Sequence, residues 1–187
     1  MSTNTSSGTL TDIAGDYTLD ASHSRLGFSA RHAMVTKVRG QFGDFEGTAR
    51  VDTATPADST VSVTIRPVSI STGSEDRDNH LRSGDFFDVE NFPTWTFTST
   101  DVSRDGSTWT IVGDLTLKDV TRPVSIDFEE TGTATDPFGN QRLGFEGELT
   151  INRKDWGLTW NAALETGGVL VSDKVKLELD LSAIKSA

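Results

Sequence analysis

Apolar and polar residues alternate along most of this chain, and that period of two is typical of β-strands with one buried face. Val61, Val63 and Ile65 show it clearly, because a polar residue follows each of them. The same alternation predicts strands at residues 25–31, 59–66, 94–102, 108–117, 124–128, 143–151 and 174–181, with two further strands at 41–52 and 158–164. The total is about eight or nine strands.

Short connections between these strands determine how they pair. Turn signals such as Arg104-Asp105-Gly106 and Asp136-Pro137-Phe138-Gly139-Asn140 leave no room for crossover helices. No stretch of ten or more residues has a strong helical period, so we expect an all-β fold of antiparallel strands. Glycines at positions 27, 113, 144 and 147 favour strongly curved strands, and hence a barrel over a flat pair of sheets.

One segment, residues 75–93, interrupts the alternation with charged residues and phenylalanines. Ser74 is a good N-cap, the acidic Glu75 and Asp76 suit a helix N-terminus, and Gly84 suits its end. The segment therefore predicts a short helix and a loop between two strands. A second helical turn is predicted at residues 32–36.

The charge balance narrows the range of partners. Asp and Glu outnumber Lys and Arg by 28 to 17, a net charge of −11 that repels the phosphates of nucleic acids and of anionic membranes. The absence of cysteine excludes disulfides, cysteine nucleophiles and thiolate metal sites. No segment approaches the roughly 20 apolar residues of a membrane-spanning helix, so we expect no nucleic-acid partner and no stable membrane insertion.

The length of 187 residues suits one all-β domain, which we expect to cover residues 11–187 after a disordered tail at residues 1–10. The N-terminus has neither a basic start nor a long apolar run, so it predicts no secretory signal and a cytoplasmic location. A protein whose signal had been removed would be periplasmic or secreted and would show the same start.

The residues expected to face the barrel interior are unusually bulky. Their rings either fill the interior or line an elongated cavity of the lipocalin kind. Ten-residue strands span roughly 33 Å, which a tilt near 40° shortens to about 25 Å of barrel height, enough for a long hydrocarbon tail. The residues predicted to contact such a tail are Leu26, Phe28, Val63, Ile65, Trp95, Phe97, Trp109, Ile111, Leu115, Phe128, Phe145 and Leu149.

Three histidines offer an alternative, a metal-dependent or hydrolytic enzyme that uses His23, His32 and His80. Their spacing matches no HExxH pattern, and the chain has no GxSxG elbow. In Ser22-His23-Ser24, adjacent residues of a strand would point to opposite faces and cannot form a catalytic relay. A further alternative is an interaction scaffold whose barrel is only structural.

Several short motifs, in this order and spacing, resemble the YceI family of polyisoprenoid-binding proteins, and the resemblance runs from about residue 15 to 184. The motifs include Asp20-Ala21-Ser22-His23-Ser24, Gly40-Gln41-Phe42, Arg77-Asp78-Asn79-His80-Leu81-Arg82-Ser83, Asp85-Phe86-Phe87-Asp88, Gly113-Asp114-Leu115-Thr116-Leu117, Thr121-Arg122-Pro123-Val124 and Ile151-Asn152-Arg153-Lys154-Asp155-Trp156-Gly157-Leu158.

The resemblance implies an extended, eight-stranded, lipocalin-like antiparallel barrel that binds a polyprenyl chain inside, often as a homodimer. It implies carriage, storage or sequestration of an isoprenoid lipid rather than catalysis. We expect the ligand to be a long-chain polyisoprenoid or a similar amphiphilic lipid, and we expect no cofactor and no metal. We expect Arg31, His32, Arg77 and His80 to lie nearer the polar end of that lipid. Residues 75–93 are then expected to shape one end of a lipid tunnel.

Overall fold

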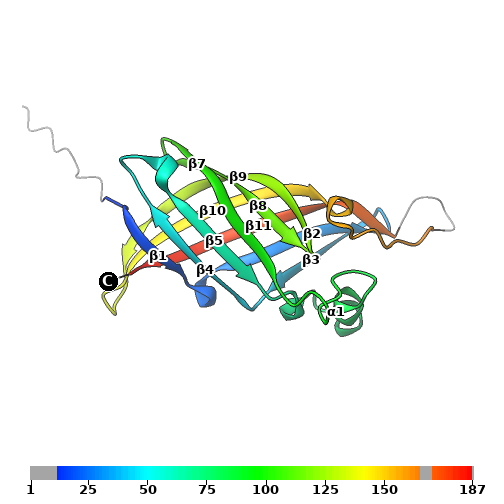
Figure 1. Cartoon of the computed structure of the whole chain (residues 1–187). Coiled ribbons are helices and arrows are strands. Elements are labelled where there is room, and N and C mark those ends of the chain that lie inside the picture. The colour runs from blue at the N-terminus through cyan, green and yellow to red at the C-terminus, as the bar shows by residue number, and fades with distance from the viewer. Residues whose placement is uncertain (1–11, 165–169, 187) are drawn as a thin grey trace, which may run out of the picture.

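The computed structural model describes residues 12–164 and 170–186, and its main feature is a closed antiparallel β-barrel (Figure 1). Eight strands surround the barrel in the order β1, β4, β5, β7, β8, β9, β10 and β11, and β11 pairs with β1 to close it. The predicted barrel is confirmed. The bounds are β1 Gly15–Leu19, β4 Phe45–Val51, β5 Thr60–Ile65, β7 Trp95–Asp105, β8 Thr108–Leu117, β9 Val120–Thr135, β10 Gln141–Asn152 and β11 Val171–Lys185.

Three further strands extend the sheet beyond the closed barrel. β11 continues past β1 and pairs with β2 (Arg25–His32), β2 pairs with β3 (Thr36–Phe42), and β3 pairs with the short β6 (Ile70–Ser71). β1 and β2 thus share one edge of β11, and a 3-10 helix, η1 (Ala21–His23), separates them. Figure 1 shows β2 and β3 reaching toward the end of the molecule that holds α1, away from the C-terminus.

The single α-helix of the described residues, α1 (Glu75–Arg82), begins as predicted. The Ser74 hydroxyl accepts a hydrogen bond from the Arg77 backbone N–H, and the helix ends one residue early, with Ser83 as its C-cap. The buried Asp78 carboxylate accepts two hydrogen bonds from Thr72, which fixes the helix beside β6. The other short helices are η2 (Pro56–Asp58), η3 (Pro67–Ser69) and η4 (Arg153–Trp156).

Three local predictions were wrong. Residues 41–52 form parts of two strands, because the chain changes partner from β2 to β1 between β3 and β4. Residues 158–164 form no strand except one bridge residue, Ala163, because the Arg153 side chain binds the carbonyls of Leu158 and Trp160. Residues 32–36 are a β-hairpin turn, closed by a hydrogen bond from the Val35 N–H to the His32 carbonyl. The predicted tail at residues 1–10 lies outside the described residues.

Some strand glycines make room for aromatic rings that lie against the backbone. A Cβ on Gly40 would lie 2.5 Å from the Phe28 ring, and one on Gly147 would lie 2.7 Å from the Phe128 ring. Each ring lies over the glycine directly opposite it in the neighbouring strand. Close approach of rings to backbone, rather than curvature alone, therefore explains these glycines.

Candidate functional site: an apolar cavity inside the barrel

Two separate clusters of buried apolar side chains pack inside the barrel. The cluster beside α1 consists of Phe42, Ile70, Phe86, Phe87, Trp95, Leu115, Leu117, Trp156 and Leu158. The second cluster consists of Ile13, Tyr17, Val102, Trp109, Ile126, Phe128 and Leu143. Between them they supply walls to one apolar cavity, so the interior is packed in places and hollow in others.

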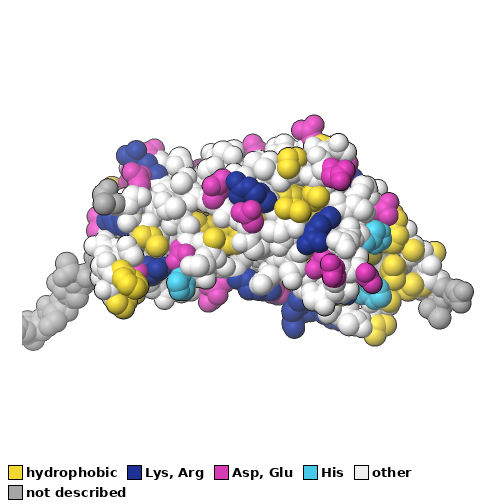
Figure 2. Space-filling model, turned by 90° about the horizontal axis from the view of Figure 1, so that it is seen from below, with side chains coloured by type: hydrophobic (Ala, Val, Ile, Leu, Met, Phe, Trp, Pro, Cys, Tyr) yellow, Lys and Arg dark blue, Asp and Glu magenta, His cyan; other side chains and the backbone are white. Residues whose placement is uncertain are grey.

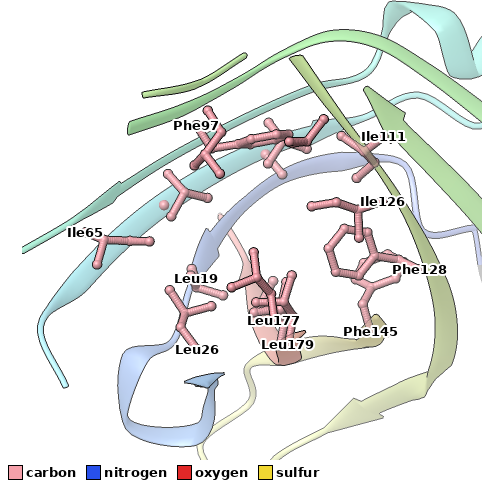
Figure 3. A pocket seen from close by; sticks show the side chains of 18 of the residues that line it. Leu19, Leu26, Ile65, Phe97, Ile111, Ile126, Phe128, Phe145, Leu177 and Leu179 are labelled. Atoms are coloured by element: carbon pink, nitrogen blue, oxygen red, sulfur yellow. The ribbon is translucent and has the colours of Figure 1, made fainter. Parts of the chain in front are cut away.

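The cavity has a volume of about 210 Å³ and is lined by every strand of the closed barrel together with β2 and β3. Figure 3 shows aliphatic and aromatic side chains pointing into it from all sides, among them Phe97, Ile111, Phe128 and Leu179. Along β8 the lining runs from Trp109 to Leu117, which at about 3.3 Å a residue is about 26 Å of strand. A sphere of this volume would be only about 7 Å across, much less than the length of strand that lines the cavity, so the cavity is elongated.

The predicted apolar residues lie almost entirely in this wall. Eleven of the twelve line the cavity: Leu26, Val63, Ile65, Trp95, Phe97, Trp109, Ile111, Leu115, Phe128, Phe145 and Leu149. Phe28 does not, because its ring lies against Gly40 and packs on Phe42 with 5.8 Å between ring centroids. The alternation in residues 174–181 predicted that Leu177, Leu179 and Leu181 share one face of a strand, and all three line the cavity. Leu19 of β1 also lines the cavity, but no pattern in the sequence predicted it.

The four residues expected at a polar end do not line the cavity. Arg31 and His32 are exposed at the end of β2, where the Arg31 guanidinium donates to the Val35 carbonyl. Arg77 donates to the carbonyl and hydroxyl of Thr72. The local structure around α1 thus engages Arg77, and a role at a lipid head group stays a prediction for all four.

His80 is held on α1 by neighbouring side chains. Its Nε2 lies 2.9 Å from an Asp85 carboxylate oxygen, and its ring packs edge-on against Phe86 and Trp160. This arrangement secures α1 and its following loop over the apolar cluster at that end of the barrel.

The three histidines do not form a catalytic or metal-binding group. They lie on η1, β2 and α1, and the described ranges contain no cluster of three side chains placed to hold a metal ion. At His23, both Ser22 Oγ and Asp20 Oδ2 approach the same ring nitrogen, Nδ1, at 3.1 and 2.8 Å. A relay needs one partner on each nitrogen, so this trio instead caps η1.

Arg142 joins η1 to the β9–β10 turn at the barrel end opposite α1. Its guanidinium lies 2.7 Å from an Asp20 oxygen and 2.9 Å from an Asp136 oxygen. Hydrogen bonds from Ser22 and Arg142 lower the pKa of Asp20. At Asp136, burial acts to raise the pKa, but hydrogen bonds from Asn140 and Arg142 outweigh it and lower the pKa to about 2.

Acidification should weaken this network. Because the pKa of Asp136 falls on folding from 3.8 to about 2, its contribution to stability is complete above about pH 4 and is lost as the pH falls toward 2. The Arg142→Met variant should therefore lose more stability at pH 7 than at pH 2.5, as measured by urea unfolding. Arg66→Met, at a more exposed ion pair, is the control. An equal loss at both pH values for Arg142→Met would contradict this account.

Arg153 is a buried charge that holds the chain at the end of the barrel near α1. Its side chain is 4% exposed and donates to the carbonyls of Leu158, Trp160, Val171 and Ser172. Burial lowers the pKa of Arg153, and the nearby Asp173 carboxylate opposes that shift. These bonds tie residues 158–160 to the start of β11, so Arg153 positions the segment that covers this end of the interior.

Comparisons with known proteins agree with this architecture. The family model described as YceI-like domain matches residues 17–183. A UPF0312 protein of Staphylococcus aureus (strain MSSA476) is 41% identical over 164 residues, which cover 87% of this chain and 94% of that protein.

Several solved structures share the fold. Burkholderia cenocepacia BcnA superposes with a TM-score of 0.77 at 22% identity, covering 88% of this chain and 98% of that one. A polyisoprenoid binding domain from Saccharophagus degradans, implicated in plant cell wall breakdown, superposes with a TM-score of 0.68 at 18% identity, covering 91% and 98%.

Proposed function

Since the chain belongs to the YceI-like domain family, we propose that it binds a long-chain polyisoprenoid or a similar amphiphilic lipid inside its barrel, for carriage, storage or sequestration and without catalysis. The observation that carries the proposal is the elongated apolar cavity of about 210 Å³. Its shape suits a flexible hydrocarbon chain better than a compact or polar molecule.

The chemistry of the wall supports binding by the hydrophobic effect. Each methylene group moved from water into such a site contributes about 0.8 kcal/mol, so about ten of them would contribute about 8 kcal/mol before the costs of association. A net free energy of that size corresponds to a dissociation constant near 1 μM. Because association itself costs at least about 4 kcal/mol, a tail must bury more than ten methylene groups to reach that affinity.

The cavity volume also suggests which part of the lipid enters. Sites for whole drug-sized ligands measure roughly 300–1,000 Å³, more than the volume found in this barrel. We propose that part of the tail occupies the cavity and that the head group stays outside.

The wall provides little for acid–base catalysis. General acid–base chemistry needs a titratable side chain within hydrogen-bond reach of the substrate, usually His, Asp or Glu. None of these three residue types occurs among the lining residues in the described part of the chain. This composition favours a binding protein over an enzyme.

The proposal is tested by the contents of gently purified protein. Native mass spectrometry should show a stoichiometric apolar adduct, and solvent extraction followed by lipid analysis should identify a long-chain lipid. Protein refolded without lipid should regain the adduct from a polyprenol suspension. A protein that stays empty under all of these conditions would count against lipid binding.

A further inference from the structure

The β2–β3 hairpin carries apolar side chains into water. At its tip Met34 and Val35 are 66% and 76% exposed, which places them among the most exposed large apolar residues in the described part of the chain. The hairpin belongs to the extension beyond the closed barrel. Figure 2 shows hydrophobic side chains gathered at that end of the molecule, next to histidine.

The backbone of this tip does not favour the residues it carries. Ala33 and Met34 have φ angles of 52° and 61°, in the left-handed region, as the two central residues of a type I′ turn require. Such turns favour Asn-Gly, and a residue with a Cβ costs about 1 kcal/mol or more there. Neither burial among the described residues nor backbone preference accounts for a methionine at this position, and this motivates the search for an external partner.

The charge of the hairpin is opposite to that of the whole protein. Residues 31–39 contain three basic residues, Arg31, Lys37 and Arg39, and no Asp or Glu, although the net charge of the chain is −11. All three are exposed, and none forms an ion pair with a carboxylate of the described ranges. Asp173, a nearby carboxylate on β11, lies 3.3 Å from the Lys154 ammonium, which partly neutralises it.

Salt screens the distant acidic residues from this tip. The acidic first turn of α1 lies near the base of β3. Thr72 connects the two, because it donates a hydrogen bond to Asp78 of α1 and its methyl group lies close to Gly40 of β3. Gly40 lies six positions after Met34, which is about 20 Å along an extended strand. The Debye length in physiological salt is about 8 Å, so the local positive charge governs what approaches the tip.

We propose that the β2–β3 hairpin docks the protein peripherally on an anionic phospholipid bilayer. Met34 and Val35 enter the interface between head groups and acyl chains, and the three basic side chains contact lipid phosphates. An exposed apolar tip with basic residues beside it combines the two attractions that hold proteins at such surfaces.

A second copy of this chain is the competing occupant, and charge disfavours it. Two hairpins that met tip to tip across a two-fold axis would bring like charges together, whereas an anionic surface complements them. The docking proposal goes beyond lipid binding in the cavity and does not depend on it, because an empty barrel could still dock.

Co-sedimentation with vesicles tests the proposal on the full chain. Binding to vesicles of equal parts phosphatidylglycerol and phosphatidylcholine should be at least tenfold tighter than to pure phosphatidylcholine, and 0.5 M salt should weaken it. Replacing Met34 and Val35 together by aspartate, or the three basic residues together by glutamine, should lower the affinity at least tenfold. Both variants change exposed positions, and thermal unfolding checks that they fold.

Phe138 provides a matched control. It is 90% exposed on the β9–β10 turn at the opposite end, where Arg142 is paired with Asp20 and Asp136. Phe138→Asp should bind vesicles as the wild type does. The proposal is overturned if the wild type ignores both vesicle types, if the hairpin variants bind normally, or if gel filtration shows that these variants instead convert a dimer into a monomer.

Discussion

Replacing Val63 by tryptophan should remove most of the bound lipid while leaving the barrel folded. Val63 lies in the cavity wall, opposite Phe97 on β7 and Gly47 on β4. The larger indole has space only toward the cavity, because the neighbouring strands flank Val63 on both sides. We expect the lipid occupancy measured by native mass spectrometry to fall at least tenfold, with little change in the unfolding midpoint, since a cavity accepts added volume without overpacking.

The control for this variant uses the preceding residue on the same strand. Ser62 is exposed and does not line the cavity, so Ser62→Trp adds the same ring outside the barrel and should leave lipid occupancy unchanged. If Val63→Trp protein retained its lipid while Ser62→Trp behaved normally, the ligand would have to bind elsewhere. A wild-type protein that never held lipid would instead refute the proposed function itself.

Replacing Arg153 by methionine should destabilise the protein by about 3 kcal/mol or more, because each buried carbonyl left without a donor costs about 1–3 kcal/mol. Methionine fills similar space but donates no hydrogen bond, which leaves buried carbonyls of residues 158–160 and of β11 unpaired. Urea unfolding followed by tryptophan fluorescence measures the change. Local loss of order near Trp156 and Trp160 should accompany it, and lipid should leave the barrel faster.

Lys154→Met is the matched control, because Lys154 is the adjacent residue but its side chain is 48% exposed and makes only a surface ion pair. Its cost should be at most about 1 kcal/mol. If the two variants cost the same, the carbonyl bonds of Arg153 would not be important for stability.

The alternation of residues was enough to predict the barrel and most of its wall. Strands with one buried face are specified locally, residue by residue, and this is why Val63, Phe97 and Trp109 were placed in the interior from sequence. β1 was not predicted as a strand from its residues, because it is short and its partners β4 and β11 lie far away in the chain. Local patterns carry little information about such pairings.

The errors share a physical cause, which is that long-range contacts overrode local pattern. The segment 158–164 has the alternation of a strand, yet the guanidinium of Arg153 donates hydrogen bonds to the carbonyls of Leu158 and Trp160, which a strand would use for pairing. Phe28 has the right alternation to face the cavity, yet Gly40 opposite it draws the ring onto the backbone. The hairpin at residues 32–36 gave a misleading signal, since Ala-Met is a poor sequence for the turn it forms.

The pairing of β1 with β11 has a consequence for how the chain folds. Tyr17 and Lys185 are neighbours in this ladder although they are 168 positions apart in the sequence. Contacts of such long range slow folding, because the entropy of closing the loop must be lost before the pairing is gained. During synthesis the barrel cannot close until β11 leaves the ribosome, and the edge of β10 stays unpaired until then. The strand that closes the barrel around the apolar cavity is therefore also the one whose late arrival leaves the nascent chain most open to aggregation.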